Sequence, residues 1–131
     1  MTQDELNKIL IKFSEFGQLS AVKEAIRQGA DVHAVNDLAL QLAAKYGRLK
    51  VVQFLLKNDA DIHAENDYAL RWAARYGRLK VVKVLLKNGA YVHAGGDYAL
   101  CWAAHNGHLD TVKILIKNRD NIHADDDGAL Q

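Results

Sequence analysis

Histidine is the residue type in this chain whose spacing most invites a chemical interpretation. Four of the six histidines recur at a constant step of 30 residues, each followed by alanine: His33, His63, His93 and His123. Imidazole is a common zinc ligand, but two ligands of one zinc ion lie within about 4 Å of each other, because a Zn–N bond is about 2 Å long. Residues that recur once per packed pair of helices lie about 8–10 Å apart. We therefore expect no metal site along this row.

Two other features carry reactive groups. Cys101 is the single cysteine, and no base is placed in the sequence to activate it, so we expect an ordinary thiol rather than a nucleophile. The run Asp125–Asp127 resembles a cation site, but three adjacent carboxylates point in different directions, and a solvated turn with Asp127 as a helix cap is the better interpretation. No catalytic triad order, phosphate loop or carboxylate pair recurs at a useful spacing. The sequence predicts a protein without catalytic residues, cofactors or metal.

The same 30-residue period is seen for glycine, aspartate and leucine residues, which mark the helices and turns that would position a binding residue. It recurs at Gly17, Gly47, Gly77 and Gly107, at Asp37, Asp67, Asp97 and Asp127, and at Leu40, Leu70, Leu100 and Leu130. In one unit, Asp67 is expected to cap a helix that Gly77 ends. The apolar face of that helix consists of Ala69, Leu70, Ala73 and Ala74.

A second helix is predicted after each glycine. In "RLKVVKVLLKN" (78–88) the apolar stripe is Leu79, Val82, Leu85 and Leu86, and the lysines lie on the opposite side. Helices of roughly 8–10 residues are marginal alone, so each pair must be stabilised by stacking on its neighbours. The fold predicted from the repeat is an all-α solenoid of stacked antiparallel helix pairs.

The repeated letters resemble the ankyrin repeat. The stretches "AARYGRLKVVKVLLKNGAYV" (73–92) and "AAHNGHLDTVKILIKN" (103–118) are close to the family pattern, and the resemblance covers about Phe13 to Gln131. Ankyrin repeats usually have 33 residues, whereas these have 30. The missing residues lie where the family builds a β-hairpin finger, so the resemblance implies shortened connectors. Such clipped, proline-free repeats are similar to those of giant amoebal virus ankyrin proteins.

Other departures concern the bonds between repeats. The family motif T-P-L-H is absent, and Gln41, Arg71 and Cys101 stand in the place of its histidine, so the usual hydroxyl–imidazole bonding between repeats is lost. The family has asparagine, bonded to connector backbone, where His33 and its equivalents stand. The resemblance implies that these histidines bond the backbone in the same way, and that protonation at low pH loosens the array.

Repeat boundaries follow from the period. We expect an N-terminal cap repeat at 1–37, with Thr2 and Glu5 in a capping box, and internal repeats at 38–67, 68–97 and 98–127. Residues 128–131 read as the truncated start of a further repeat. An uncapped end exposes apolar surface, so end-to-end self-association through the C-terminus is an expected partner mode.

Composition and charge limit the environment of the chain. It has 131 residues, half of them apolar, and a formal net charge of +1, and no apolar run approaches the length needed to span a membrane. One cysteine fits a reducing compartment, so we expect a cytoplasmic protein, in the host cytoplasm if it is viral. Residues 38–97 carry ten basic and five acidic side chains, a net +5, which would attract an acidic peptide or a phosphate backbone or simply form a solvated face.

Some positions vary between the repeats while the framework stays constant. Leu38, Gln41, Leu42 and Lys45 become Tyr68, Arg71, Trp72 and Arg75, then Tyr98, Cys101, Trp102 and His105. In ankyrin proteins the first helices and connectors form a concave binding face. The candidate partner-binding residues are therefore Tyr68, Arg71, Trp72, Arg75, Tyr98, Cys101, Trp102 and His105. The alternative for the tryptophans is that they fill the space between stacked helices.

The function these observations favour is a non-catalytic scaffold that binds a partner protein or peptide on the concave face. One alternative is polyanion or nucleic-acid binding through the basic central repeats, although nucleic-acid domains are usually more basic overall. Another is a structural or engineered array with no natural ligand.

Overall fold

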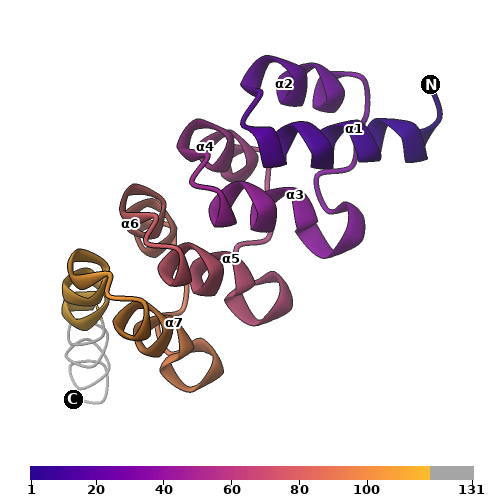
Figure 1. The fold of residues 1–131 in the computed structure, drawn as a ribbon. Helices are drawn as coiled ribbons and strands as arrows, with labels where there is room; N and C mark the ends of the chain where they lie inside the picture. The colour runs from indigo at the N-terminus through magenta and orange to yellow at the C-terminus, as the bar shows by residue number, and fades with distance from the viewer. Residues whose placement is uncertain (119–131) are drawn as a thin grey trace.

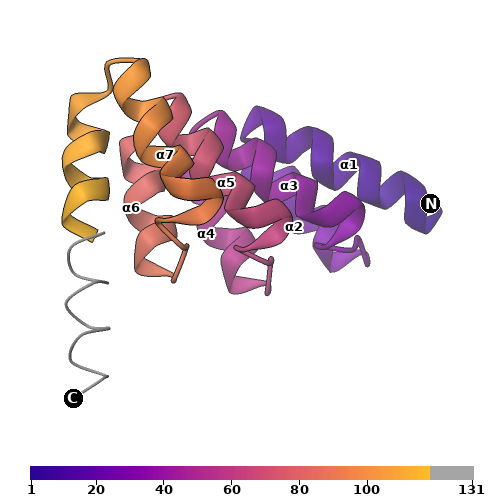
Figure 2. The ribbon, with the colours of Figure 1, turned by 90° about the horizontal axis from the view of Figure 1, so that it is seen from below.

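The computed structural model describes residues 1–118 as two parallel rows of helices joined by short connectors. The helices are α1 (Gln3–Phe16), α2 (Leu19–Arg27), α3 (Ala34–Lys45), α4 (Leu49–Lys57), α5 (Ala64–Arg75), α6 (Leu79–Lys87) and α7 (Ala94–His105), and residues 109–118 are also helical. The odd-numbered helices form one row and the even-numbered helices the other (Figure 1). Residues 1–118 contain no strand, and the connectors project on one side of the array (Figure 2). The predicted all-α solenoid with shortened connectors is confirmed.

Alanine pairs set the spacing of the odd-numbered row. Ala43, Ala44, Ala73 and Ala74 are fully buried, and α3 packs closely on α1 and α5, as α5 does on α3 and α7. The even-numbered helices touch one another far less. Small side chains let the odd-numbered helices approach one another closely. We use the term inner face for the surface of the odd-numbered row that lies opposite the even-numbered helices.

Glycine ends the first helix of each repeat, as predicted. Gly77 adopts φ 67°, a left-handed conformation that glycine enters without steric cost. A Cβ atom at Gly77 would also lie 2.5 Å from the His108 ring of the next repeat. The expected capping box at the N-terminus is present, because Thr2 Oγ1 accepts from Glu5 N at 3.1 Å and Glu5 accepts in return from Thr2 N.

The connectors replace the family's hairpin with a left-handed turn. Val35, Asn36 and Asp37 all have φ between 54° and 60°, and residues 65–67 and 95–97 repeat this conformation. A left-handed conformation costs a residue with a Cβ atom roughly 1–2 kcal/mol, and a β-branched residue such as Val35 is especially unfavourable there. The last described turn avoids most of this strain by using Gly95 and Gly96.

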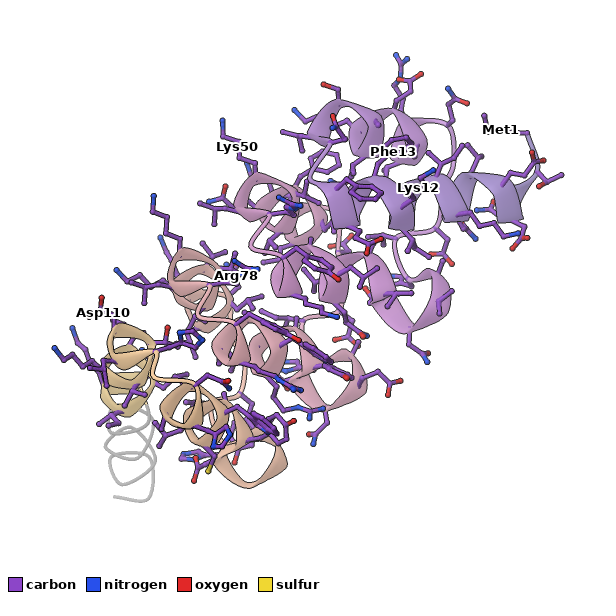
Figure 3. All side chains as sticks on the ribbon, viewed as in Figure 1. Met1, Lys12, Phe13, Lys50, Arg78 and Asp110 are labelled. Carbon is purple, nitrogen blue, oxygen red and sulfur yellow. The ribbon has the colours of Figure 1, made fainter. Side chains whose placement is uncertain are left out.

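Two hydrogen bonds join each repeat to its neighbours. In one, a side chain of the first helix accepts from an amide of the next repeat: Asp37 from Asp61 N at 2.7 Å and Asp67 from Tyr91 N at 2.8 Å. Asn7 accepts in the equivalent way from Asp31 N at 2.8 Å within the cap repeat. In the other, a side chain donates to a carbonyl of the preceding repeat: Arg48 to Glu15 O, Arg78 to Lys45 O and His108 to Arg75 O, each at 3.0 Å. Arg78 is labelled in Figure 3. These bonds take the place of the missing hydroxyl–imidazole bonds.

Two sequence-based expectations about these residues are wrong. Asp67 does not cap its own helix, because its buried carboxylate bonds to Tyr91 N and to the His63 ring instead. The histidines do not bond the backbone through Nδ1, since this atom of His33, His63 and His93 lies 2.7–3.0 Å from the carboxylate of the aspartate four residues later. A carboxylate offers a stronger, charge-assisted acceptor than a carbonyl.

This pairing also reverses the expected effect of pH. The hydrogen bond that the His33 ring donates to Asp37 is the main cause that raises the pKa of His33 above its ordinary value of 6.5. A raised pKa in the folded state means that protonation stabilises the fold. The prediction that low pH loosens the array is therefore wrong for this residue. The predictions for His123, the Asp125–Asp127 run, Asp127 as a cap and residues 128–131 fall outside the described residues.

Candidate interaction surface

Helical periodicity places the variable positions together on the inner face. Positions 68, 71, 72 and 75 lie within two turns on one side of α5, and their equivalents 38, 41, 42 and 45 occupy the same side of α3. The buried side of each helix is occupied by the constant Ala and Leu residues. The variable side chains are therefore free to project outward from a rigid framework.

Three aromatic rings form a stack along α5. Tyr68 and Trp72 have ring centroids 5.2 Å apart with planes inclined by 15°, and Trp72 and Tyr76 are 5.4 Å apart with planes inclined by 13°. These residues follow one another at steps of four, one helical turn each. Trp72 thus has a tyrosine ring one turn before it and another one turn after it.

Arg71 bridges two repeats and is largely occupied by the protein itself. Its guanidinium lies 4.8 Å from the Tyr68 ring and 5.0 Å from the Tyr98 ring. Its Nε donates to Asn66 O at 3.0 Å and its Nη2 to Glu65 O at 2.9 Å, so it also holds the left-handed turn of its own repeat. This candidate residue has a structural role that the sequence did not reveal.

Two further cations lie against the tryptophan rings. The Lys45 ammonium is 4.3 Å from the Trp72 ring centroid, and the Arg75 guanidinium is 4.2 Å from that of Trp102 and 5.3 Å from that of Trp72. Cation–π attraction fixes these side chains without neutralising their charge. Both tryptophans are half-buried, so each also contributes to the surface.

The surface of α7 is more open. Tyr98 and Trp102 are 5.4 Å apart and tilted by 39°, and the His105 ring meets Trp102 edge-on at 5.6 Å. Cys101 is exposed, and with Trp102 and His105 it lines a surface pocket of about 360 Å³. All eight candidate residues therefore lie on the odd-numbered helices α5 and α7, although whether they bind a partner stays a prediction.

One binding feature was missed by sequence reasoning. A pocket of about 200 Å³, which we call the seam pocket, lies between α3 and α5 and is lined by Leu38, Gln41, Leu42, Lys45, Tyr68 and Trp72. The first four were recognised as variable positions but not included among the candidate residues. The signal was present, because each of them shares its position in the 30-residue repeat with a candidate residue.

The remaining basic side chains lie elsewhere. Lys50 projects from α4 away from the odd-numbered helices (Figure 3), and α6 carries the exposed Lys80, Lys83 and Lys87. No group of three or more His, Cys, Asp or Glu side chains in residues 1–118 could hold a metal ion. None of the helices in this part of the chain combines the length and apolarity needed to cross a membrane.

Comparison with known proteins agrees with this architecture. A family model described as "Ankyrin repeats (3 copies)" matches residues 10–95, and one described as "Ankyrin repeat" matches residues 95–127. A search of curated proteins gave no match.

Proposed function

The chain belongs to the ankyrin repeat family, whose repeats generally mediate protein–protein interaction, and we propose that it binds a partner protein or peptide on its inner face. Proteins of this family are typically non-catalytic. The observation that carries the proposal is the gathering of Tyr68, Trp72, Trp102, Arg71 and Arg75 on that face, since aromatic residues and arginine dominate the energy of protein interfaces.

Rigidity supports the same conclusion. Stacking of the rings and cations fixes side chains that would otherwise lose rotamer freedom when a partner binds. The seam pocket adds a recess beside the rings that is large enough for one side chain of a partner. An interface of rigid anchors next to a recess is the arrangement that protein partners use.

A selection from a random-peptide display library tests the proposal and does not require that the partner be identified. Peptides that bind the wild-type chain should lose about tenfold or more in affinity on a Tyr68→Ala/Arg75→Ala variant. The matched control is Lys50→Ala/Lys83→Ala on α4 and α6, which should bind as the wild type does. Thermal unfolding of both variants controls for folding. Selected peptides that bind both variants equally well would place the binding site elsewhere.

The exposed lysines of the even-numbered helices favour a second candidate, polyanion binding. Lys50, Lys57, Lys80, Lys83 and Lys87 are exposed on α4 and α6, and none of them pairs with a carboxylate among the described residues. Affinity for heparin or duplex DNA should then fall steeply as salt rises, and less so in the Lys50→Ala/Lys83→Ala variant. A shallow salt dependence shared by both would argue against it.

Self-association is a third candidate. Leu109 is 69% and Ile116 43% exposed at the far end of the described array, where no further described repeat covers them. If these residues join copies of the chain, Leu109→Lys should reduce the concentration dependence of the sedimentation coefficient. The cytoplasmic placement expected from the sequence likewise stays a proposal.

A further inference from the structure

Two cations on the inner face occupy the same position in successive repeats, and no carboxylate among the described residues pairs with either of them. Lys45 on α3 and Arg75 on α5 are 30 residues apart in sequence, and neither forms an ion pair with a carboxylate in residues 1–118. Arg71, by contrast, donates from its guanidinium to Glu65 O and Asn66 O. Lys45 and Arg75 are therefore the two cations of this cluster whose N–H groups make no hydrogen bond within the described residues and stay available to a partner.

The Trp72 ring beside these two cations is already surrounded by other side chains. Trp72 lies between Tyr68 and Tyr76 with the Lys45 ammonium 4.3 Å from its centroid, and Arg75 lies 4.2 Å from the centroid of Trp102. Single-stranded nucleic acid binds such surfaces by stacking bases on open ring faces. The Trp72 ring therefore offers little open face for a base, and the cations beside it favour carboxylates of a peptide over bases of a nucleic acid.

Lys45 and Arg75 stand at equivalent positions of the adjacent packed helices α3 and α5, so the spacing of these helices favours one peptide conformation. Adjacent packed helices lie about 8–10 Å apart. In a polyproline II helix, residues i and i+3 point the same way and are about 9.3 Å apart, since the rise is about 3.1 Å per residue. In a β-strand, residues on one side are i, i+2 and i+4, about 7 or 14 Å apart, which misses this spacing.

From the uncompensated pair and its spacing, we propose that the inner face binds an acidic peptide in polyproline II conformation, with carboxylates at i and i+3 over Lys45 and Arg75. The inference rests on the proposed inner-face function and names the chemistry of the partner. Glu15 occupies the same repeat position in α1, so the row changes sign there. We therefore expect the peptide residue that lies over Glu15, one repeat beyond Lys45, to be basic.

Defined peptides test the spacing. A short fluorescein-labelled proline-rich peptide with glutamates at i and i+3 is compared, by anisotropy at low salt, with a peptide of the same composition with glutamates at i and i+2. We expect the first to bind about threefold to fivefold more tightly. Because Trp72 and Trp102 are the two tryptophans of the chain and adjoin the proposed contacts, their emission should also change on binding. Equal affinity of the two peptides would overturn the proposal.

Charge reversal tests the residues. Lys45→Glu/Arg75→Glu should remove binding of the acidic peptide and create binding of a peptide with lysines at i and i+3. Lys50→Glu/Lys80→Glu, which changes the net charge equally but on α4 and α6, should leave the affinity within about twofold at moderate salt. Equal weakening by both variants would show general electrostatic attraction and overturn the assignment.

The display selection distinguishes failure of this inference from failure of the inner-face function. If selected peptides require Tyr68 and Arg75 but contain no acidic pair at i and i+3, and the defined peptides show no spacing preference, the acidic-peptide inference is wrong and the inner-face function stands. If selected peptides bind independently of Tyr68 and Arg75, both are wrong.

Discussion

The α3–α5 and α5–α7 interfaces share the same buried framework but differ at the inner face. The first leaves a pocket there, and the second is occupied by side chains. The first contains the seam pocket, because Leu38, Gln41 and Leu42 are too small to fill it. In the second, Arg71 lies between two tyrosine rings and Arg75 between two tryptophan rings. Identical buried alanines support both. The comparison shows that substitutions at a few outward positions can open or close a recess without altering the packing beneath it.

The largest effect should come from the shared alanine layer. Ala74→Leu adds volume to a fully buried position and should destabilise the fold by about 1–3 kcal/mol through overpacking. Ala44→Leu, in the equivalent position, should cost about the same if the two interfaces have the same base, whereas the exposed Ala104→Leu should cost little. Urea unfolding of the three variants measures this. Unequal costs for Ala44 and Ala74 would mean that the two layers differ below the surface as well.

Removal of Arg71 should turn the closed surface into an open one. Arg71→Ala deletes two hydrogen bonds to the left-handed turn and two ring contacts, and should destabilise the protein by about 1–2 kcal/mol. Gln41→Ala removes only one hydrogen bond, to Asn36 O, and should cost less. Chemical denaturation provides the values, and a crystal structure of the Arg71 variant should show a new pocket between Tyr68 and Tyr98. A larger loss for Gln41→Ala would contradict this role of Arg71.

The left-handed turns provide a narrower comparison. Gly96 has φ 69°, and a Cβ atom added there meets nothing within 4 Å, so Gly96→Ala should destabilise the fold by about 1 kcal/mol through backbone strain alone. At the equivalent of Gly95 in the first turn, Val35→Gly should act in the opposite direction, because it relieves a β-branched residue at φ 55°. Thermal unfolding of both variants checks the signs. Stabilisation by Gly96→Ala would show that the turn carries no strain.

The smallest effect concerns the His33–Asp37 pair. Because Asp37 raises the pKa of His33, the stabilisation from this pair is complete below the unfolded-state pKa and is lost as pH rises through the folded-state pKa. The His33 side chain is 52% exposed, so solvent screening limits the gain between pH 8 and pH 5.5 to a few tenths of a kcal/mol, as for other exposed pairs. The difference in urea midpoint between wild type and His33→Gln, followed over this range, measures it. A wild type that loses stability relative to His33→Gln as pH falls would contradict the sign.

The framework could be predicted because it repeats. A leucine, a pair of alanines and a glycine recur in this order every 30 residues. This period places the leucine and alanines on the buried helix faces and the glycine at the helix end. The inter-repeat bonds could not be predicted in the same way. Asp37 bonds an amide 24 residues later and Arg48 a carbonyl 33 residues earlier, and local spacing does not reveal contacts that form only after the helix pairs stack.

The sequence predicted which variable residues share one face, but it did not predict the role of each. Variation between repeats located Tyr68, Arg71 and Trp102 on one face, since only residues outside the packed core are free to change. That Arg71 would turn back onto its own connector depends on the left-handed turn at 65–67. The letters Glu65, Asn66 and Asp67 signal that turn only weakly, because asparagine and aspartate adopt positive φ as single residues rather than three in succession.

The paired bonds that link each repeat forward and backward also determine how the chain would respond to mechanical load. The first two interfaces between repeats carry the same two bonds, and the third shares one of them, from His108 to Arg75 O. A pulling force applied to the termini would therefore rupture interfaces of similar strength one after another. Each rupture would release about 100 Å of contour length, the extended length of 30 residues. The array would then behave as a spring with evenly matched links.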